Sequence, residues 1–180
     1  MLKESEFKNK LINKLNSFYD GWRDGDLDTT QGMKVDIIND NLKIAIEIKD
    51  DTKYRFGDSA STNLHIKGRQ FKDDVKQGDK KFINYPDYQT LLIIRTDIDK
   101  KVIEYVLGGC HAFGSINGQQ QYTGRPSTFW GCHDNSINEV GALLFWGKKS
   151  LYFRPNDNPN ANKNRVITLE HIKNIMDLNL

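Results

Sequence analysis

A chain of 180 residues is long enough to bury a hydrophobic core without disulfides or a structural metal, so we expect a single domain over residues 1–180. Hydrophobic residues make up 37% of the chain and charged residues 28%, a balance that excludes wholesale disorder. No apolar stretch is long enough to cross a membrane, and the N-terminus lacks the apolar region of a signal peptide. We therefore expect a cytoplasmic protein with no membrane partner.

The net charge of +2 and the two cysteines leave the partner open. A nucleic-acid-binding protein needs only a local basic surface, so this charge neither indicates nor excludes one. Two cysteines are too few for the disulfide framework of a secreted domain. Cys110-His111 and Cys132-His133 could form a metal set, but adjacent residues in extended structure point to opposite faces, and the usual ligand spacing is absent. The pattern favours free thiols and leaves a structural zinc open.

Apolar residues near the N-terminus recur at helical spacing and predict a helix over residues 3–18. They are Phe7, Leu11, Ile12, Leu15 and Phe18. On the helical wheel Glu4 lies in line with this stripe, whereas Glu6 points nearly the opposite way. We therefore expect Glu4 to be directed toward the interior.

Two strands are predicted next, over Val35–Ile38 and Leu42–Lys49, around a polar turn. The even positions of the second strand are all apolar. Because strand side chains alternate, Glu47 and Lys49 share the other face.

The length of the turn decides which residue faces Glu47. A two-residue turn at Asp40-Asn41 pairs Asp36 with Ala45 and places Asp36 on the face of Glu47 and Lys49. Asp36 and Glu47 are then diagonal neighbours, with Cα atoms about 7 to 8 Å apart. A three-residue turn would put Asp36 on the wrong face.

Two carboxylates and a lysine in this arrangement indicate phosphodiester chemistry. Neighbouring carboxylates repel unless a cation neutralises them, and Mg²⁺ or Mn²⁺ prefers carboxylate oxygens and retained waters. Lys49 can orient or help deprotonate an attacking water and stabilise charge developing on the phosphate. Glu4 could supply an outer carboxylate. The ordinary alternative is a solvated strand face on which charged residues pair across strands.

Asp36 followed by Glu47-Ile48-Lys49 resembles the motif of the PD-(D/E)XK, or restriction-endonuclease-like, nuclease superfamily, with Val35 in place of its usual proline. The resemblance covers about residues 2–95. It implies that Asp36, Glu47 and the Ile48 carbonyl bind the metal and that Lys49 serves the hydrolytic step. Glu4 is similar to a first-helix glutamate of several members, including archaeal Holliday junction resolvases. Gln70 is similar to a glutamine that some branches place beside the active site.

The rest of the chain predicts further elements of an α/β fold. A charged helix from Leu64 to about Gln77-Gly78 precedes a strand at Thr90–Arg95 that is apolar on both faces, as in a central strand. A short helix over 98–106 and a Gly/Gln-rich stretch over 108–131 follow. A hairpin of Ala142–Trp146 with Ser150–Arg154, and a closing helix near 169–176, complete the chain. We expect a restriction-endonuclease-like core over 2–95, with a mixed central sheet flanked by helices, and an elaboration over 96–180.

The leading functional hypothesis is a Mg²⁺-dependent or Mn²⁺-dependent DNA endonuclease of the restriction, homing or junction-resolving type. The resemblance also implies a possible homodimer. Basic residues on the charged helix and just after its predicted end could follow a phosphate backbone, although acidic residues are interleaved with them. These are Lys67, Arg69, Lys72, Lys76, Lys80 and Lys81. A ribonuclease or single-strand nuclease, and a catalytically silent nucleic-acid-binding or protein-interaction module, remain open alternatives.

Overall fold

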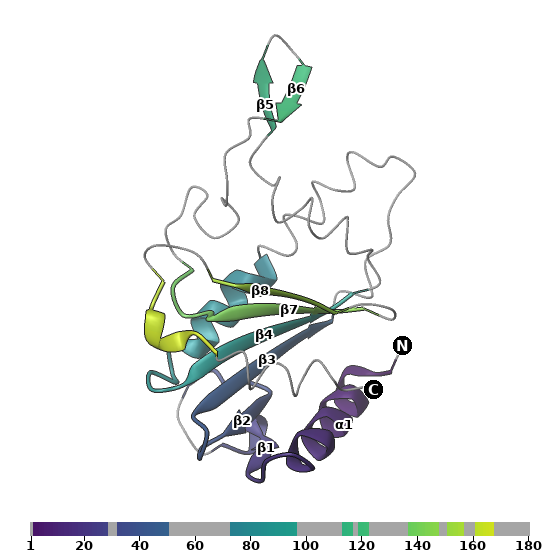
Figure 1. Cartoon of the computed structure of the whole chain (residues 1–180), viewed down its shortest axis with the longest axis vertical. Coiled ribbons are helices and arrows are strands. Elements are labelled where there is room, and N and C mark those ends of the chain that lie inside the picture. The colour runs from purple at the N-terminus through teal and green to yellow at the C-terminus, as the bar shows by residue number, and fades with distance from the viewer. Residues whose placement is uncertain are drawn as a thin grey trace.

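The computed structural model describes residues 2–28, 32–50, 73–96, 113–116, 119–122, 137–147, 151–156 and 161–167. Their main feature is a six-stranded mixed sheet in the order β1-β2-β3-β4-β7-β8 (Figure 1). Its strands are β1 (Trp22–Asp24), β2 (Ile37–Asn39), β3 (Ile44–Asp50), β4 (Gln89–Arg95), β7 (Ala142–Trp146) and β8 (Leu151–Pro155). Within the described part of the chain, no helix is both long enough and apolar enough to cross a membrane.

Parallel pairing is confined to the middle of the sheet. β3 and β4 run parallel, as do β4 and β7, whereas β1, β2 and β8 join by antiparallel pairing. Parallel strands are usually covered on both faces, and all residues from Thr90 to Arg95 are buried. The sequence prediction of a central strand here and of a mixed sheet flanked by helices is confirmed.

Two helices among the described residues cover the two faces of the sheet. α1 (Glu4–Asn16) packs Phe7, Leu11 and Leu15 on one face. A second helix, described over residues 73–82, packs Val75 and Phe82 on the other. Each such buried apolar side chain contributes about 1.5–3 kcal/mol relative to its exposed state. The two apolar layers fix which strand residues face which helix.

The second helix corrects the sequence prediction of its end. Gly78 was expected to end the helix, but the helix continues through it to residue 82. Gly78 is buried, and a Cβ added there would lie 3.2 Å from Leu92 Cδ1. The glycine therefore serves close packing of helix on sheet, and Phe82 extends the apolar stripe beyond it.

Strand β1 was not predicted, because the sequence around it contains glycine and aspartate and indicated a turn. β1 is short, and it pairs with β2 from Trp22 opposite Asn39. The side chain of Asn16, the last residue of α1, donates to the Trp22 carbonyl at 2.8 Å and accepts from its N–H at 2.9 Å. Tertiary hydrogen bonds thus hold an edge strand that local propensity does not favour.

The second half of the chain is described only in part. The predicted hairpin is confirmed as β7 with β8, in which Trp146 pairs with Leu151. Within the Gly/Gln-rich stretch, β5 (Phe113–Ile116) and β6 (Gln119–Tyr122) form a separate two-stranded sheet. The predicted helices at 98–106 and 169–176, and the residues Cys110, His111, Cys132 and His133, lie outside the described residues.

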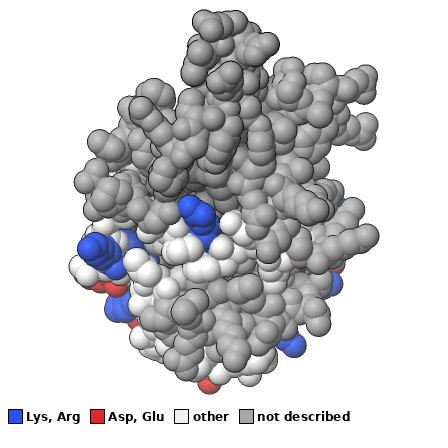
Figure 2. Space-filling view, turned by 45° about the horizontal axis from the view of Figure 1, so that its top comes forward, with Lys and Arg blue, Asp and Glu red and all other residues white. Residues whose placement is uncertain are grey.

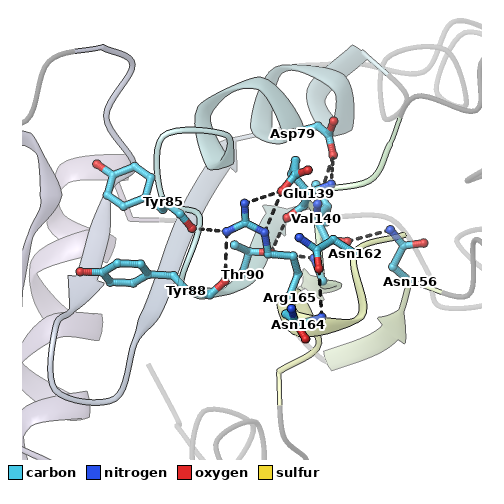
Figure 3. Close-up of polar contacts among 11 residues, drawn as sticks. Asp79, Tyr85, Tyr88, Thr90, Glu139, Val140, Asn156, Asn162, Asn164 and Arg165 are labelled. Atoms are coloured by element: carbon cyan, nitrogen blue, oxygen red, sulfur yellow. Dashed lines mark hydrogen bonds and ion pairs between the residues drawn. The ribbon is translucent and has the colours of Figure 1, made fainter. Parts of the chain in front are cut away.

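Arg165 ties together the segments that lead into β4 and β7 (Figure 3). Its buried guanidinium donates from Nε to Glu139 Oε2 at 2.7 Å, and from Nη1 to the carbonyls of Tyr85 and Tyr88. Thr90 Oγ1 donates to the Glu139 carbonyl and accepts from the N–H of Gly141. These contacts fix the amino ends of two central strands.

We expect Arg165→Met to lower the free energy of unfolding by about 3 kcal/mol, because it leaves Glu139 and the carbonyls of Tyr85 and Tyr88 without this donor. Lys163→Met, an exposed change in the same 3-10 turn, is the control, with an expected effect of less than about 0.5 kcal/mol. Urea unfolding of both variants measures the difference. Equal stability of the two variants would contradict a structural role for Arg165.

Candidate functional site

The turn between β2 and β3 has four residues, 40–43, so the two-residue turn expected from the sequence is wrong. Asn39 pairs with Ile44, and its side-chain oxygen accepts from the N–H groups of Asn41 and Leu42 at 3.0 and 2.9 Å. Lys43 closes the turn with a left-handed φ of 54°. The register is displaced by two residues from the expected one. Because side chains alternate with a period of two, an even displacement leaves every residue on its expected face.

Asp36 lies directly before β2 and is half-buried. Extending the register by one residue places it opposite Glu47 and not diagonal to it. Its Oδ2 accepts from the N–H of Ile48 at 2.7 Å, a donor that a longer β2 would have paired through its backbone. In an antiparallel pair the N–H and C=O of one residue point to the same neighbour, so the Ile48 carbonyl also points toward the side of Asp36.

Glu47 is the only carboxylate among the fully buried described residues of the sheet, and its side chain is 1% exposed. The Nζ atoms of Lys49 and Lys81 lie 2.8 and 2.6 Å from its Oε1. Within the described chain, Oε2 has no hydrogen-bond partner. Burial and the nearby charge of Asp36 raise the pKa of the Glu47 carboxyl to about 7, although both lysines act in the opposite direction. The alternative of a fully solvated strand face is therefore wrong for Glu47.

Lys49 is on the same face as Glu47, as the alternation of β3 predicted. Burial lowers the pKa of its ammonium group, but the carboxylates of Glu47, Asp36 and Asp74 outweigh burial and raise that pKa above its usual value. Lys49 is consequently a cation at neutral pH. In this state it can donate hydrogen bonds and stabilise negative charge, but it cannot accept a proton from water.

Lys81 is the site residue that the sequence reasoning missed. It was named only among the cations of the charged helix, and that helix was expected to end before it. Asp74, Gly78 and Lys81 are spaced by four and three residues, so they share one face of the helix. The buried Gly78 marks this face as the one that lies on the sheet. This spacing could have indicated from the sequence that Lys81 faces the sheet.

The structure does not bring Glu4 to this set. Glu4 is exposed, so the expectation that it points into the interior is wrong. α1 packs on the face that carries Ile44, Ile46 and Ile48, whereas Glu47 and Lys49 belong to the opposite face. The stripe of α1 becomes buried only from Phe7 onward, and an acid in the first turn is favoured by the helix dipole alone.

Most of the residues that the sequence predicts to contact nucleic acid lie before the second helix begins to be described at residue 73. Gln70, Lys67, Arg69 and Lys72 lie outside the described residues, and Lys76 is half-buried on the second helix. On the face shown in Figure 2, the described Lys and Arg side chains lie in separate small groups among uncharged and acidic residues. No continuous basic field forms among the described residues of that face.

The donor set fits a hard divalent cation with few protein ligands. Among the described residues there is no group of three or more His, Cys, Asp or Glu side chains that could hold a metal. Asp36, Glu47 and the Ile48 carbonyl nevertheless offer only oxygen atoms, and Glu47 Oε2 is buried without a partner. Mg²⁺ is commonly held by one or two carboxylates and keeps several waters, so a third carboxylate is not required.

Comparison of the chain with protein-family models, curated proteins and solved structures finds no match.

The raised pKa of Glu47 makes the stability of the protein depend on pH. The unfolded carboxyl titrates near 4.5 and the folded one near 7. The folded state thus binds this proton more tightly, and the resulting stability is full below pH 4.5 and lost as pH rises through 7. In EDTA, we expect the free energy of unfolding of wild type minus that of Glu47→Gln to fall by about 2.5 kcal/mol between pH 5 and 8.

Glu6→Gln changes an exposed carboxylate on α1 and is the matched control. Its stability should follow that of wild type at each pH. A ¹³C NMR titration of the Glu47 carboxyl gives the midpoint directly. A midpoint below 5 would contradict the burial argument.

Proposed function

We propose that this protein is a divalent-metal-dependent nuclease that hydrolyses DNA phosphodiester bonds, with a restriction-endonuclease-like core and a PD-(D/E)XK-type site at Asp36, Glu47 and Lys49. One observation carries the proposal. Two carboxylates and a lysine cation meet on one face at the end of the β2–β3 hairpin, and the buried carboxylate keeps one oxygen without a partner among the described residues.

Asp36 and Glu47 would hold the cation, together with the Ile48 carbonyl. The hydrogen bond from Ile48 N–H fixes one oxygen of Asp36, and the ion pairs at Oε1 fix Glu47. Both carboxylates are thereby oriented before any ligand arrives, which limits the entropy lost on binding. When bound, the cation would stabilise negative charge on the phosphate oxygens and lower the pKa of a water molecule that it binds.

Lys49 would stabilise the charge that develops on phosphorus oxygens. Its side chain is 18% exposed, so Lys49 borders both the buried carboxylate and the surface from which a polyanion would approach. Because the pKa of Lys49 is raised, Lys49 would act as a hydrogen-bond donor and electrostatic stabiliser. The proton of the attacking water must then pass to another acceptor, such as solvent or a phosphate oxygen.

A catalytically silent nucleic-acid-binding module is the second candidate. The observation that favours it is the ion pairing of Glu47 with two lysines, which stabilises this geometry without any metal. In that case the lysines would contact phosphate and no bond would be cut. Activity measurements separate the two candidates.

We expect Glu47→Gln and Lys49→Met each to reduce metal-dependent cleavage at least about 100-fold, because each removes a group that acts on the reacting phosphate. Substrates are plasmid, linear, branched and single-stranded DNA and RNA, each in EDTA, Mg²⁺ and Mn²⁺. Glu6→Gln and Lys10→Met, both at exposed positions of α1, should cleave at the wild-type rate.

The preferred substrate assigns the subclass, since the chemistry at phosphorus does not select the sugar. RNA cleavage alone would replace the DNA proposal by a ribonuclease. Nucleic-acid binding without cleavage in any metal would favour the silent module. Cleavage that persists in both site variants would refute this site.

A further inference from the structure

Two ammonium groups from different elements contact a single carboxylate oxygen. Lys49 comes from β3 and Lys81 from the second helix, and both lie within 2.8 Å of Glu47 Oε1. One lysine would suffice as the counter-ion of one carboxylate. The second positive charge therefore balances the nearby Asp36, while Asp74 lies beside Lys49 as a further acid.

The two lysines beside Glu47 disfavour the binding of a divalent cation when no nucleic acid is bound. A cation held by Asp36 and Glu47 would lie near both ammonium groups. Neighbouring like charges repel strongly when they are partly buried. The carboxylates are also already neutralised, so the cation gains less from them. We expect the affinity of the free protein for divalent cations to be low.

Lys81 is placed so that it can leave this contact. Its side chain is 27% exposed, compared with 1% for Glu47, so its ammonium group lies at the boundary between the buried carboxylate and solvent. A phosphate group arriving there would offer it a new anionic partner. If Lys81 moved to the phosphate, its positive charge would leave the neighbourhood of Glu47. The phosphate would at the same time bring negative charge to the site, and both changes would favour a bound cation.

We propose that Lys81 is a built-in counter-ion of Glu47 that suppresses divalent-cation binding by the free protein and couples cation binding to the arrival of nucleic-acid phosphate. This inference rests on the proposed function. Lys81 is here a positioning residue that acts through Glu47. Because coupling between two ligands is reciprocal, bound cation should also strengthen phosphate binding.

Mn²⁺ binding to the free protein, followed by electron paramagnetic resonance at pH 8, tests the inference without measuring activity. We expect Lys81→Met to bind Mn²⁺ about tenfold more tightly than wild type, because one nearby positive charge is removed. Lys80→Met, on the exposed side of the same helix, should remain within about twofold of wild type, and so should Lys81→Arg, which keeps the charge. An Asp36→Asn, Glu47→Gln double variant identifies the binding that belongs to this site.

Wild-type protein provides a second measurement that needs no variant. A single-stranded phosphorothioate oligonucleotide that resists cleavage should tighten Mn²⁺ binding at least about fivefold, the lower end of ordinary coupling between sites. The inference is overturned if Lys81→Met binds Mn²⁺ no more tightly than wild type, or if the oligonucleotide leaves the wild-type affinity unchanged. Cleavage is assayed separately, so a negative result with an active enzyme refutes the role of Lys81 and not the nuclease.

Discussion

The carboxylate of Glu47 is buried in a sheet face lined mainly by apolar side chains, and this burial constrains the charged groups around it. Ala45, Leu92 and Ile94 belong to the same apolar cluster. An ionised carboxylate taken out of water costs several kcal/mol unless charged groups compensate it. Lys49 from β3 and Lys81 from the second helix provide that compensation. A strand and the helix that covers it are thus joined by charge as well as by apolar contact.

A short hairpin then determines which second acid joins Glu47. β2 begins at Ile37, directly after Asp36, and the Asp36 side chain takes the backbone donor of Ile48 that a longer strand would have used. The short strand therefore fixes the position of this carboxylate. A backbone carbonyl and two carboxylates from adjacent strands are thereby brought to one point by local hydrogen bonding.

Hydrogen bonds and ion pairs fix the opposite end of the central strands. Arg165 and Thr90 bind the segments before β4 and β7, and Asp79 accepts from the N–H groups of Glu139 and Val140. At the carboxyl end of β4, on the α1 face, Arg95 pairs with Asp50 and lies over the ring of Phe7. Charged groups in these networks are satisfied. Glu47 Oε2 differs from them in having no partner in the described chain, and residues held by a rigid scaffold are the ones suited to bind a ligand reproducibly.

The sequence by itself determined the alternation of β3, and with it the common face of Glu47 and Lys49, because a period of two is a local property of strands. It also determined the burial of β4, because a strand with apolar side chains on both faces of the sheet is buried on both faces. Only the tertiary structure decided the four-residue turn, the edge strand at Trp22, the exposure of Glu4 and the approach of Lys81 to Glu47. The last three depend on contacts between residues distant in sequence: the pairing of β1 with β2, the packing of Gly78 on Leu92, and the sheet face that each helix covers. The periodicity of a sequence carries no information on contacts between distant segments. It therefore indicated Asp36, Glu47 and Lys49, but not Lys81.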